Sequence, residues 1–295
     1  MNKIILTVVS VLLCFVIASI AGAQTEYVSQ VPQKVSKNGI RYGQFNACNI
    51  GETKMKKKMK VGGKEVSVIA QMAQVTKDLD ILVIQEVSTS DFGAKAIAML
   101  ADELNRTGTK WDYIVSDKTS GDGSERYAIL WKTSVVSYIV RPNSGLEFTL
   151  SSLMDREPYH AQLKIKGKNL NIYSFHLVPT AKNPENEAKL VEAHASVFDK
   201  EYSILSGDFN LGHKVLDNHF EGIMSLKHQI EGKTSLKMKV KDGNYYAEEY
   251  DNIYTGKKIK VNKSAIIDFV KNIGDLTEAR KLSDHLIAYV EFEML

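Results

Sequence analysis

The sequence predicts a single mixed α/β domain, and three observations support this prediction. Short apolar runs that are typical of buried strands alternate with segments that have helical spacing. No internal repeat and no shift in composition marks a second domain within the 295 residues. An apolar content of 44% and a charged content of 25% are those of a soluble globular protein. The formal net charge of +3 is nearly balanced and does not by itself predict a polyanionic partner.

The N-terminal segment 1–23 is expected to be a cleaved signal peptide. Lys3 supplies the positive start, the apolar core spans 4–20, and Ala21-Gly22-Ala23 fits a small-x-small cleavage site. The alternative is a retained membrane anchor. Cleavage near Ala23 predicts a secreted protein, extracellular or periplasmic, and the loss of one lysine lowers the net charge from +3 to +2.

The polar residues 24–39 are expected to form a flexible leader, and residues 40–295 to form the domain. In its first half we expect strands over 40–45, 81–84 and 113–115, a strand pair over 126–131 and 135–140, and helices over 66–77 and 92–104. The lysine-rich run 54–60 is typical of a solvated face, and phosphate contact is the alternative.

The second half begins with a predicted hairpin, 159–165 with 170–175, that turns at Lys166-Gly167-Lys168. A helix is predicted over 184–198, because Pro184 stands at its start and two glutamates follow in the first turn. A buried strand over 202–205 comes next. The polar stretch 212–250 has weak periodicity, so we expect a long loop with short strands there. Strands over 252–254, 266–270 and 286–292 complete the prediction.

Cys48 has no partner once Cys14 leaves with the signal peptide, so the mature chain is expected to lack disulfides. A nucleophilic role for Cys48 is one interpretation. We favour a half-buried structural cysteine, because no other feature of the sequence indicates a thiol enzyme.

Polar side chains that suit metal binding or acid–base chemistry stand at the ends of the predicted strands. The stretch Ser206-Gly207-Asp208-Phe209-Asn210 is, alone, as typical of a turn as of a site. The same kind of residue recurs at other strand ends, and ligands gather at such edges of α/β sheets. We therefore predict one shared site, built from Asn46, Glu86, His176, Asp208 with Asn210, and Asp284 with His285.

These residues resemble the endonuclease/exonuclease/phosphatase superfamily, and within it deoxyribonuclease I. The resemblance covers about residues 40–293 and implies a four-layer α/β/β/α sandwich of two packed mixed sheets flanked by helices. The matching blocks, in the order of the family, are FNACNIGETKM (45–55), DILVIQEV (80–87), SERYAILWK (124–132), REPY (156–159), SFHLVP (174–179), SGDFN (206–210), YDNIY (250–254) and SDH (283–285).

The resemblance implies a magnesium site with Glu86 as main ligand and Asn46 and Asp284 near the same ion. This oxygen-rich set suits a hard cation. Mn²⁺ is expected to substitute for Mg²⁺. Ca²⁺ binding is left open, because no acidic calcium loop precedes Arg156.

The resemblance also implies two catalytic imidazoles, each paired with a carboxylate: His176 with Glu125, and His285 with Asp251. Two such pairs could take a proton from water and protonate the leaving oxygen. Asp208 and Asn210 would orient the water and hold the phosphate, with Asp208 beside a possible second ion. Arg156 and Thr53 would contact phosphate. Purely structural alternatives remain for three of these positions: a surface turn at Arg156-Glu157, an exposed sheet pair at Glu125-Arg126, and a strand start at Asp251.

The sequence departs from deoxyribonuclease I where that family contacts the minor groove: Cys48, Ser88 and Gly123 replace two arginines and a tyrosine. The resemblance thus implies a secreted, metal-dependent endonuclease that hydrolyses DNA, duplex or single-stranded, as a monomer without a membrane or an obligate protein partner. One alternative is a phosphodiesterase or phosphatase of the same superfamily that acts on a lipid or phosphoinositide. The other is a catalytically inactive nucleic-acid-binding module.

Overall fold

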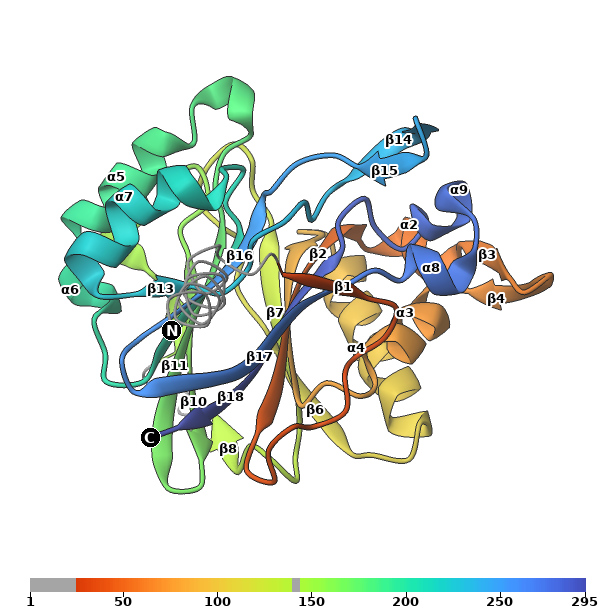
Figure 1. Ribbon diagram of the computed structural model, residues 1–295, viewed down its shortest axis with the longest axis horizontal. Coiled ribbons are helices and arrows are strands. Elements are labelled where there is room, and N and C mark those ends of the chain that lie inside the picture. The colour runs from red at the N-terminus through yellow and green to blue at the C-terminus, as the bar shows by residue number, and fades with distance from the viewer. Residues whose placement is uncertain (1–24, 140–143) are drawn as a thin grey trace, which may run out of the picture.

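The computed structural model describes residues 25–139 and 144–295, and it contains two large mixed sheets packed face to face (Figure 1). The predicted signal peptide, 1–23, lies outside the described residues. The first sheet has the order β1 (Glu26–Val28), β17 (Ile259–Ile267), β18 (Ile287–Met294), β2 (Ile40–Ile50), β5 (Ile81–Val87), β7 (Arg126–Lys132) and β6 (Trp111–Val115).

The second sheet contributes the other half of the core. Its order is β13 (Lys227–His228), β16 (Asp251–Thr255), β12 (Ser203–Asp208), β11 (Lys168–His176), β10 (Tyr159–Ile165) and β8 (Tyr138–Ile139), and β9 (Gly145–Leu146) also pairs with β10. The two sheets meet chiefly through β2 and β5 on one side and β11, β12 and β16 on the other.

Helices cover the outer face of each sheet. α3 (Val68–Thr76) and α4 (Asp91–Arg106) pack on the first sheet, and α5 (Glu185–Ala193), α6 (Ala195–Phe198) and α7 (His213–Met224) pack on the second (Figure 1). The predicted four-layer sandwich is therefore confirmed. Smaller elements are α2 (Glu52–Lys56), β3 (Lys58–Val61), β4 (Lys64–Ser67), β14 (Leu236–Lys241), β15 (Asn244–Tyr246), α8 (Val270–Ile273), α9 (Leu276–Ala279) and 3₁₀ turns at Phe148–Leu150 and Thr180–Lys182. Within the described residues, no helix is both long and apolar enough to cross a membrane.

The hairpin prediction is confirmed, since β10 and β11 pair in register from Tyr159↔Ser174 to Ile165↔Lys168. The prediction of a loop with short strands over 212–250 is wrong in its first part, where α7 forms. Leu216, Phe220 and Met224 recur every four residues, and all three are buried against the second sheet. Burial of this apolar stripe is enough to form a helix, although most residues around it are polar.

The prediction that strands 126–131 and 135–140 pair with each other is also wrong. After β7 the chain turns at Lys132–Val136 and crosses to the second sheet, where Tyr138 and Ile139 pair with β10. Residue 140 lies outside the described part of the chain. The cause is local: Val136 is buried at the crossing, so the apolar residues around it resemble one continuous strand, although only β8 forms there and it belongs to the other sheet.

Four other boundaries differ from the prediction. Residues 64–67 form β4, and α3 begins only at Val68. The helix predicted over 184–198 divides at His194. Of the strand predicted over 266–270, only residues 266–267 are in the sheet, as the end of the longer β17, and Val270 begins α8. Residues 25–39 pack against the domain instead of forming a free leader. β1 runs parallel to β17, and Val31 is buried because its side chain joins the apolar core.

Candidate active site

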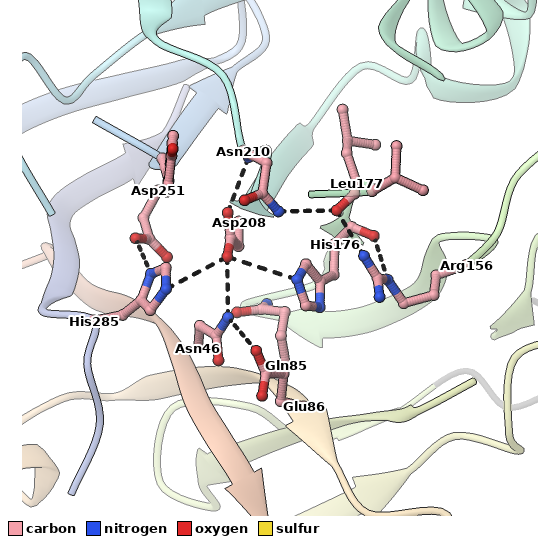
Figure 2. A network of polar contacts seen from close by, with 12 residues as sticks. Asn46, Gln85, Glu86, Arg156, His176, Leu177, Asp208, Asn210, Asp251 and His285 are labelled. Carbon is pink, nitrogen blue, oxygen red and sulfur yellow. Dashed lines mark hydrogen bonds and ion pairs between the residues drawn. The ribbon is translucent and has the colours of Figure 1, made fainter. Parts of the chain in front are cut away.

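Irregularities at the ends of β2 and β5 place the first two predicted site residues. The register between these strands shifts between Asn46 and Ile50, and Glu86 has a left-handed backbone, with φ of 58°. Side chains alternate between the two faces along a regular strand. With Gln85 facing the space between the sheets, a regular strand would therefore point Glu86 to the opposite face. Bulges of this kind redirect a side chain and are common beside active sites. Here Glu86 reaches the strand-end site while Gln85 enters the space between the sheets (Figure 2).

His176, the last residue of β11, forms the first predicted imidazole–carboxylate pair. Its Nδ1 lies 2.7 Å from Oε2 of Glu125, which immediately precedes β7. Both side chains are buried. Glu125 also accepts the backbone N–H of Glu86 through Oε1 at 3.1 Å, so one carboxylate positions both the imidazole and the bulge.

His285 forms the second pair. Its Nδ1 lies 2.7 Å from Oδ2 of Asp251, the first residue of β16, and this carboxylate is fully buried. In both pairs the carboxylate binds Nδ1, which leaves Nε2 as the nitrogen that faces the site.

The two Nε2 atoms converge on one oxygen of Asp208. Oδ2 of Asp208 lies 3.6 Å from Nε2 of His176 and 3.6 Å from Nε2 of His285 (Figure 2). Asp208 ends β12, which runs parallel to β11. The close approach of these strands requires the preceding glycine, because a Cβ on Gly207 would lie 1.9 Å from the backbone oxygen of Phe175. The Ser-Gly-Asp sequence is thus a packing requirement as well as a site motif.

The surrounding carboxylates change the acid–base behaviour of both imidazoles. Burial alone would lower the pKa of His285, but the charges of Asp251 and Asp208 outweigh it and raise the pKa to about 10. The pKa of His176 is raised as well, because Glu125 and Asp208 outweigh the lowering by burial. Burial raises the pKa of Asp251, against the lowering effect of His285. Both imidazoles therefore retain a proton more readily than a free histidine.

Asn46 joins the two acidic parts of the site. Its Nδ2 donates to Oε1 of Glu86 at 2.9 Å and to Oδ2 of Asp208 at 3.0 Å, while its Oδ1 accepts the N–H of Cys48. Glu86 has no ion pair with a lysine or arginine in the described part of the chain, and it lines the cavity. A partly buried carboxylate that has no lysine or arginine partner and lies beside a second carboxylate suits a hard divalent cation. Glu86 and Asp208 thus fit a metal, and Asn46 positions both carboxylates.

Two other predicted residues, Asp284 and Thr53, do not line the cavity around Glu86 and His176. Asp284 hydrogen-bonds the Cys48 thiol and lies 3.4 Å from Nη2 of Arg280. Burial raises the pKa of the Cys48 thiol to about 11, which is opposite to what a nucleophilic cysteine needs. Thr53 is exposed on α2 and does not line the cavity around Glu86 and His176.

Arg156 and Asn210 line the cavity but bind the backbone of the same segment. Arg156 donates from Nε to the carbonyl of His176 at 2.8 Å and from Nη2 to that of Leu177 at 2.7 Å. Asn210 donates from Nδ2 to the same Leu177 carbonyl at 3.0 Å, and its backbone N–H donates to Asp208 (Figure 2). These contacts fix the backbone that carries His176, and only Nη1 of Arg156, 3.5 Å from the Gly123 carbonyl, is held loosely.

Sequence reasoning missed a buried polar network beneath the site. Nε2 of Gln44 donates to Oδ1 of Asp251 at 3.1 Å and to Oε1 of Gln85 at 2.7 Å, and Gln85 donates to Oγ of Ser174 at 2.8 Å. The sequence feature that could have indicated this network is the presence of two glutamines and a serine within otherwise apolar strands. It also missed Lys54, which is buried and donates to the carbonyls of Ala47 and Leu282, although the run 54–60 suggested a solvated face.

The site opens into a cavity of about 340 Å³. It is lined by Asn49, Glu86, Gly123, Ser124, Glu125, Arg156, His176, Pro179, Asp208, Asn210 and His285. Two imidazoles with raised pKa values, three carboxylates and an arginine in one cavity can bind an anion beside a cation and transfer protons on both sides of it. That is the chemistry of a phosphate-ester hydrolase.

Comparisons with known proteins give a structural match and no sequence match. No protein-family model and no curated protein matches the chain. An endonuclease/exonuclease/phosphatase family protein from Leptotrichia buccalis C-1013-b has a TM-score of 0.61 at 18% identity, covering 86% of this chain and 100% of that one. D. rerio TDP2 complexed with single-strand DNA product has a TM-score of 0.60 at 16% identity, with coverage of 88% and 100%.

A third similar structure, a mannosyl-6-phosphatase from Bacteroides thetaiotaomicron VPI-5482, has a TM-score of 0.57 at 18% identity, covering 86% of this chain and 99% of that one. Identities this low demonstrate a shared architecture and not a shared substrate. The chain has the fold of the endonuclease/exonuclease/phosphatase family.

Proposed function

We propose that the chain is a secreted, metal-dependent endonuclease of the deoxyribonuclease I type, which hydrolyses DNA phosphodiester bonds. The observation that carries the proposal is the convergence of two imidazoles, each held by a buried carboxylate, on Oδ2 of Asp208 at 3.6 Å. Proton transfer is needed on both sides of a phosphate in hydrolysis, and two oriented imidazoles supply it.

In this mechanism the chain holds and moves protons around a bound phosphate. His285, with its pKa raised to about 10, keeps a proton near neutral pH and protonates the leaving oxygen. The raised pKa makes His176 a stronger base, so in its neutral form this residue, on the other side of Asp208, takes a proton from the attacking water, and Asp208 orients that water (Figure 2). Glu125 and Asp251 hold the two rings in place.

A cation fits beside Glu86 and Asp208. Mg²⁺ or Mn²⁺ held there would neutralise charge on a phosphate oxygen and stabilise the transition state. Nη1 of Arg156, which lines the same cavity, would add positive charge. The D. rerio TDP2 complex with single-strand DNA supports a nucleic-acid substrate for this architecture.

A second candidate is a phosphatase or phosphodiesterase that acts on a small phosphate ester or a lipid. Gly123 lines the cavity, and Cys48 and Ser88 replace two arginines that would contact DNA in deoxyribonuclease I. One structure with the same fold is a mannosyl-6-phosphatase. This candidate shares the catalytic residues and differs only in what enters the cavity.

A plasmid-nicking assay with a substrate panel separates the candidates. The purified chain is incubated with supercoiled plasmid in Mg²⁺, in Mn²⁺ and in EDTA, and in parallel with single-stranded DNA, mannose 6-phosphate and phosphoinositide vesicles. We expect relaxed plasmid with either metal and only supercoiled plasmid in EDTA. Intact plasmid together with phosphate release from a sugar or lipid would contradict the endonuclease proposal and favour the second candidate.

A further inference from the structure

A second cluster of histidines and carboxylates lies outside the catalytic cavity, where α7 meets β13 and β16 (Figure 1). Its centre is His228. Nδ1 of His228 lies 3.0 Å from Oδ2 of Asp217 and 3.0 Å from Oε1 of Glu221, one turn apart on α7. Nε2 lies 3.1 Å from Oε1 of Glu231. Both nitrogens of this imidazole therefore face carboxylates.

A second imidazole stands beside the first. The rings of His213 and His228 have centroids 4.9 Å apart, and Nδ1 of His213 lies 3.0 Å from Oε2 of Glu249. One ligand atom each from His213, His228 and Glu231 lie within 4.8 Å of one another. Neither histidine belongs to the catalytic machinery, so the proposed function leaves this arrangement unexplained.

We propose that His213, His228 and Glu231 form a binding site for one Zn²⁺ ion. Two imidazoles and a glutamate form a familiar protein ligand set for zinc. Ligands at about 2.0–2.1 Å in a tetrahedron stand about 3.3 Å apart. The 3.1 Å between Nε2 of His228 and Oε1 of Glu231 is close to such an edge, and the third ligand, which lies within 4.8 Å of the others, needs to approach by at most about 1.5 Å.

The outer carboxylates match the second layer of a zinc site. Zinc-bound histidines usually donate their other ring N–H to a carboxylate, which fixes the ring. Glu249 does this for His213 through Nδ1, and Asp217 and Glu221 do it for His228. Tyr254 donates its hydroxyl to Asp217 at 2.8 Å, so the outer layer is itself held by β16.

The charge of the cluster also favours a cation. In the described part of the chain, the four carboxylates of Asp217, Glu221, Glu231 and Glu249 form no ion pair with a lysine or arginine. Imidazole ligands favour zinc over Mg²⁺ and Ca²⁺, which prefer all-oxygen sets. The ion therefore differs in class from the one expected beside Glu86.

The position of the site suggests what the ion does for the fold. His213 begins α7, three residues after Asn210, and Glu249 stands two residues before Asp251. A zinc ion would join the start of α7 to β13 and to the segment that follows it. It would thereby fasten the segment that follows Asp208 and Asn210 and, through Glu249, the segment that precedes Asp251, without contacting the substrate.

The test counts zinc ions bound to the full chain. Protein is loaded with Zn²⁺ and dialysed, and retained zinc is measured by mass spectrometry, with thermal unfolding followed in parallel. The background is Glu86→Gln, which weakens the catalytic metal site. We expect about one zinc per chain, and a midpoint of unfolding that rises by several degrees with Zn²⁺ but not with Mg²⁺. The double substitution His213→Gln with His228→Gln should lose both effects.

His219→Gln is the matched control. His219 also lies on α7 and faces carboxylates of Glu192 and Glu185, but it is in no three-ligand group among the described residues. This variant should keep the zinc ion. The proposal is overturned if the Glu86→Gln protein retains no zinc, or if the double variant, folded by circular dichroism, retains as much as its parent. Because no catalytic assay enters, failure here leaves the endonuclease proposal standing.

Discussion

Nδ1 of His285 lies 2.7 Å from Oδ2 of Asp251, although 34 positions separate the two residues in the sequence. The partner carboxylate is fully buried. A charge removed from water in this way is stable only beside an opposite charge, so the pair holds a proton that a free histidine would lose.

The first prediction is that the His285–Asp251 pair stabilises the fold less as the pH rises. The pKa of His285 is raised to about 10 in the folded chain, against about 6.5 in the unfolded chain, so between these values the folded state binds the extra proton. The stabilisation is complete below about pH 6.5 and falls by up to about 1.4 kcal/mol per pH unit towards pH 10.

The measurement is urea unfolding in EDTA from pH 6 to 9.5, for the parent chain and for His285→Gln. The difference in unfolding free energy should shrink with pH. A difference that grows with pH in the His285→Gln series would contradict the assignment.

The second prediction concerns the metal ligand. Glu86→Gln keeps the shape of the side chain but removes its charge, so it should raise the Mg²⁺ concentration needed for half-maximal activity by at least about tenfold. Nicking rates measured over a Mg²⁺ series test this. The matched control is Glu52→Gln, because Glu52 is exposed on α2 and its carboxylate pairs with Lys56 away from the cavity. An unchanged Mg²⁺ dependence for Glu86→Gln would show that Glu86 is not a ligand of the metal.

The third prediction assigns Gln44 as a positioning residue. Gln44→Leu leaves Oδ1 of Asp251 and Oε1 of Gln85 without this donor, which should lower the unfolding free energy by about 1–3 kcal/mol. Because Asp251 orients His285, we also expect kcat to fall about tenfold while KM stays near its original value.

Tyr42→Phe is the control for Gln44. Its hydroxyl lies 2.5 Å from Oγ of Ser206 in the same space between the sheets, but it does not contact a catalytic pair. It should lower stability without changing kcat. If both variants change only stability, Gln44 contributes to packing alone.

The site residues were predictable from the sequence because each stands at a strand end. Asn46, Glu86, His176 and Asp208 follow apolar runs, His285 precedes one, and the sheets bring those strand ends together. Residues that support the site from below were not predictable. Gln44 lies inside a strand like any sheet residue, and only the packing of two sheets shows that it meets Asp251.

The missed elements have a similar physical origin. α7 depends on Leu216, Phe220 and Met224, a narrow stripe within a polar sequence, and its burial comes from the second sheet. Lys54 belongs to a lysine-rich run, yet two backbone carbonyls bind its amine, and burial lowers its pKa to about 8. Long-range contacts decide both cases, and local composition does not contain them.

The most direct test of the account is the nicking rate of His176→Ala, His285→Ala and the double variant in saturating Mg²⁺. The imidazoles act on one phosphate, so each single variant should lose about 10²–10⁴-fold in kcat. The double variant should lose much less than the product of the two single losses. His160→Ala, at a half-buried position in β10 outside the cavity, serves as the control. If either single variant cleaves plasmid at the parent rate, the proposed mechanism is wrong.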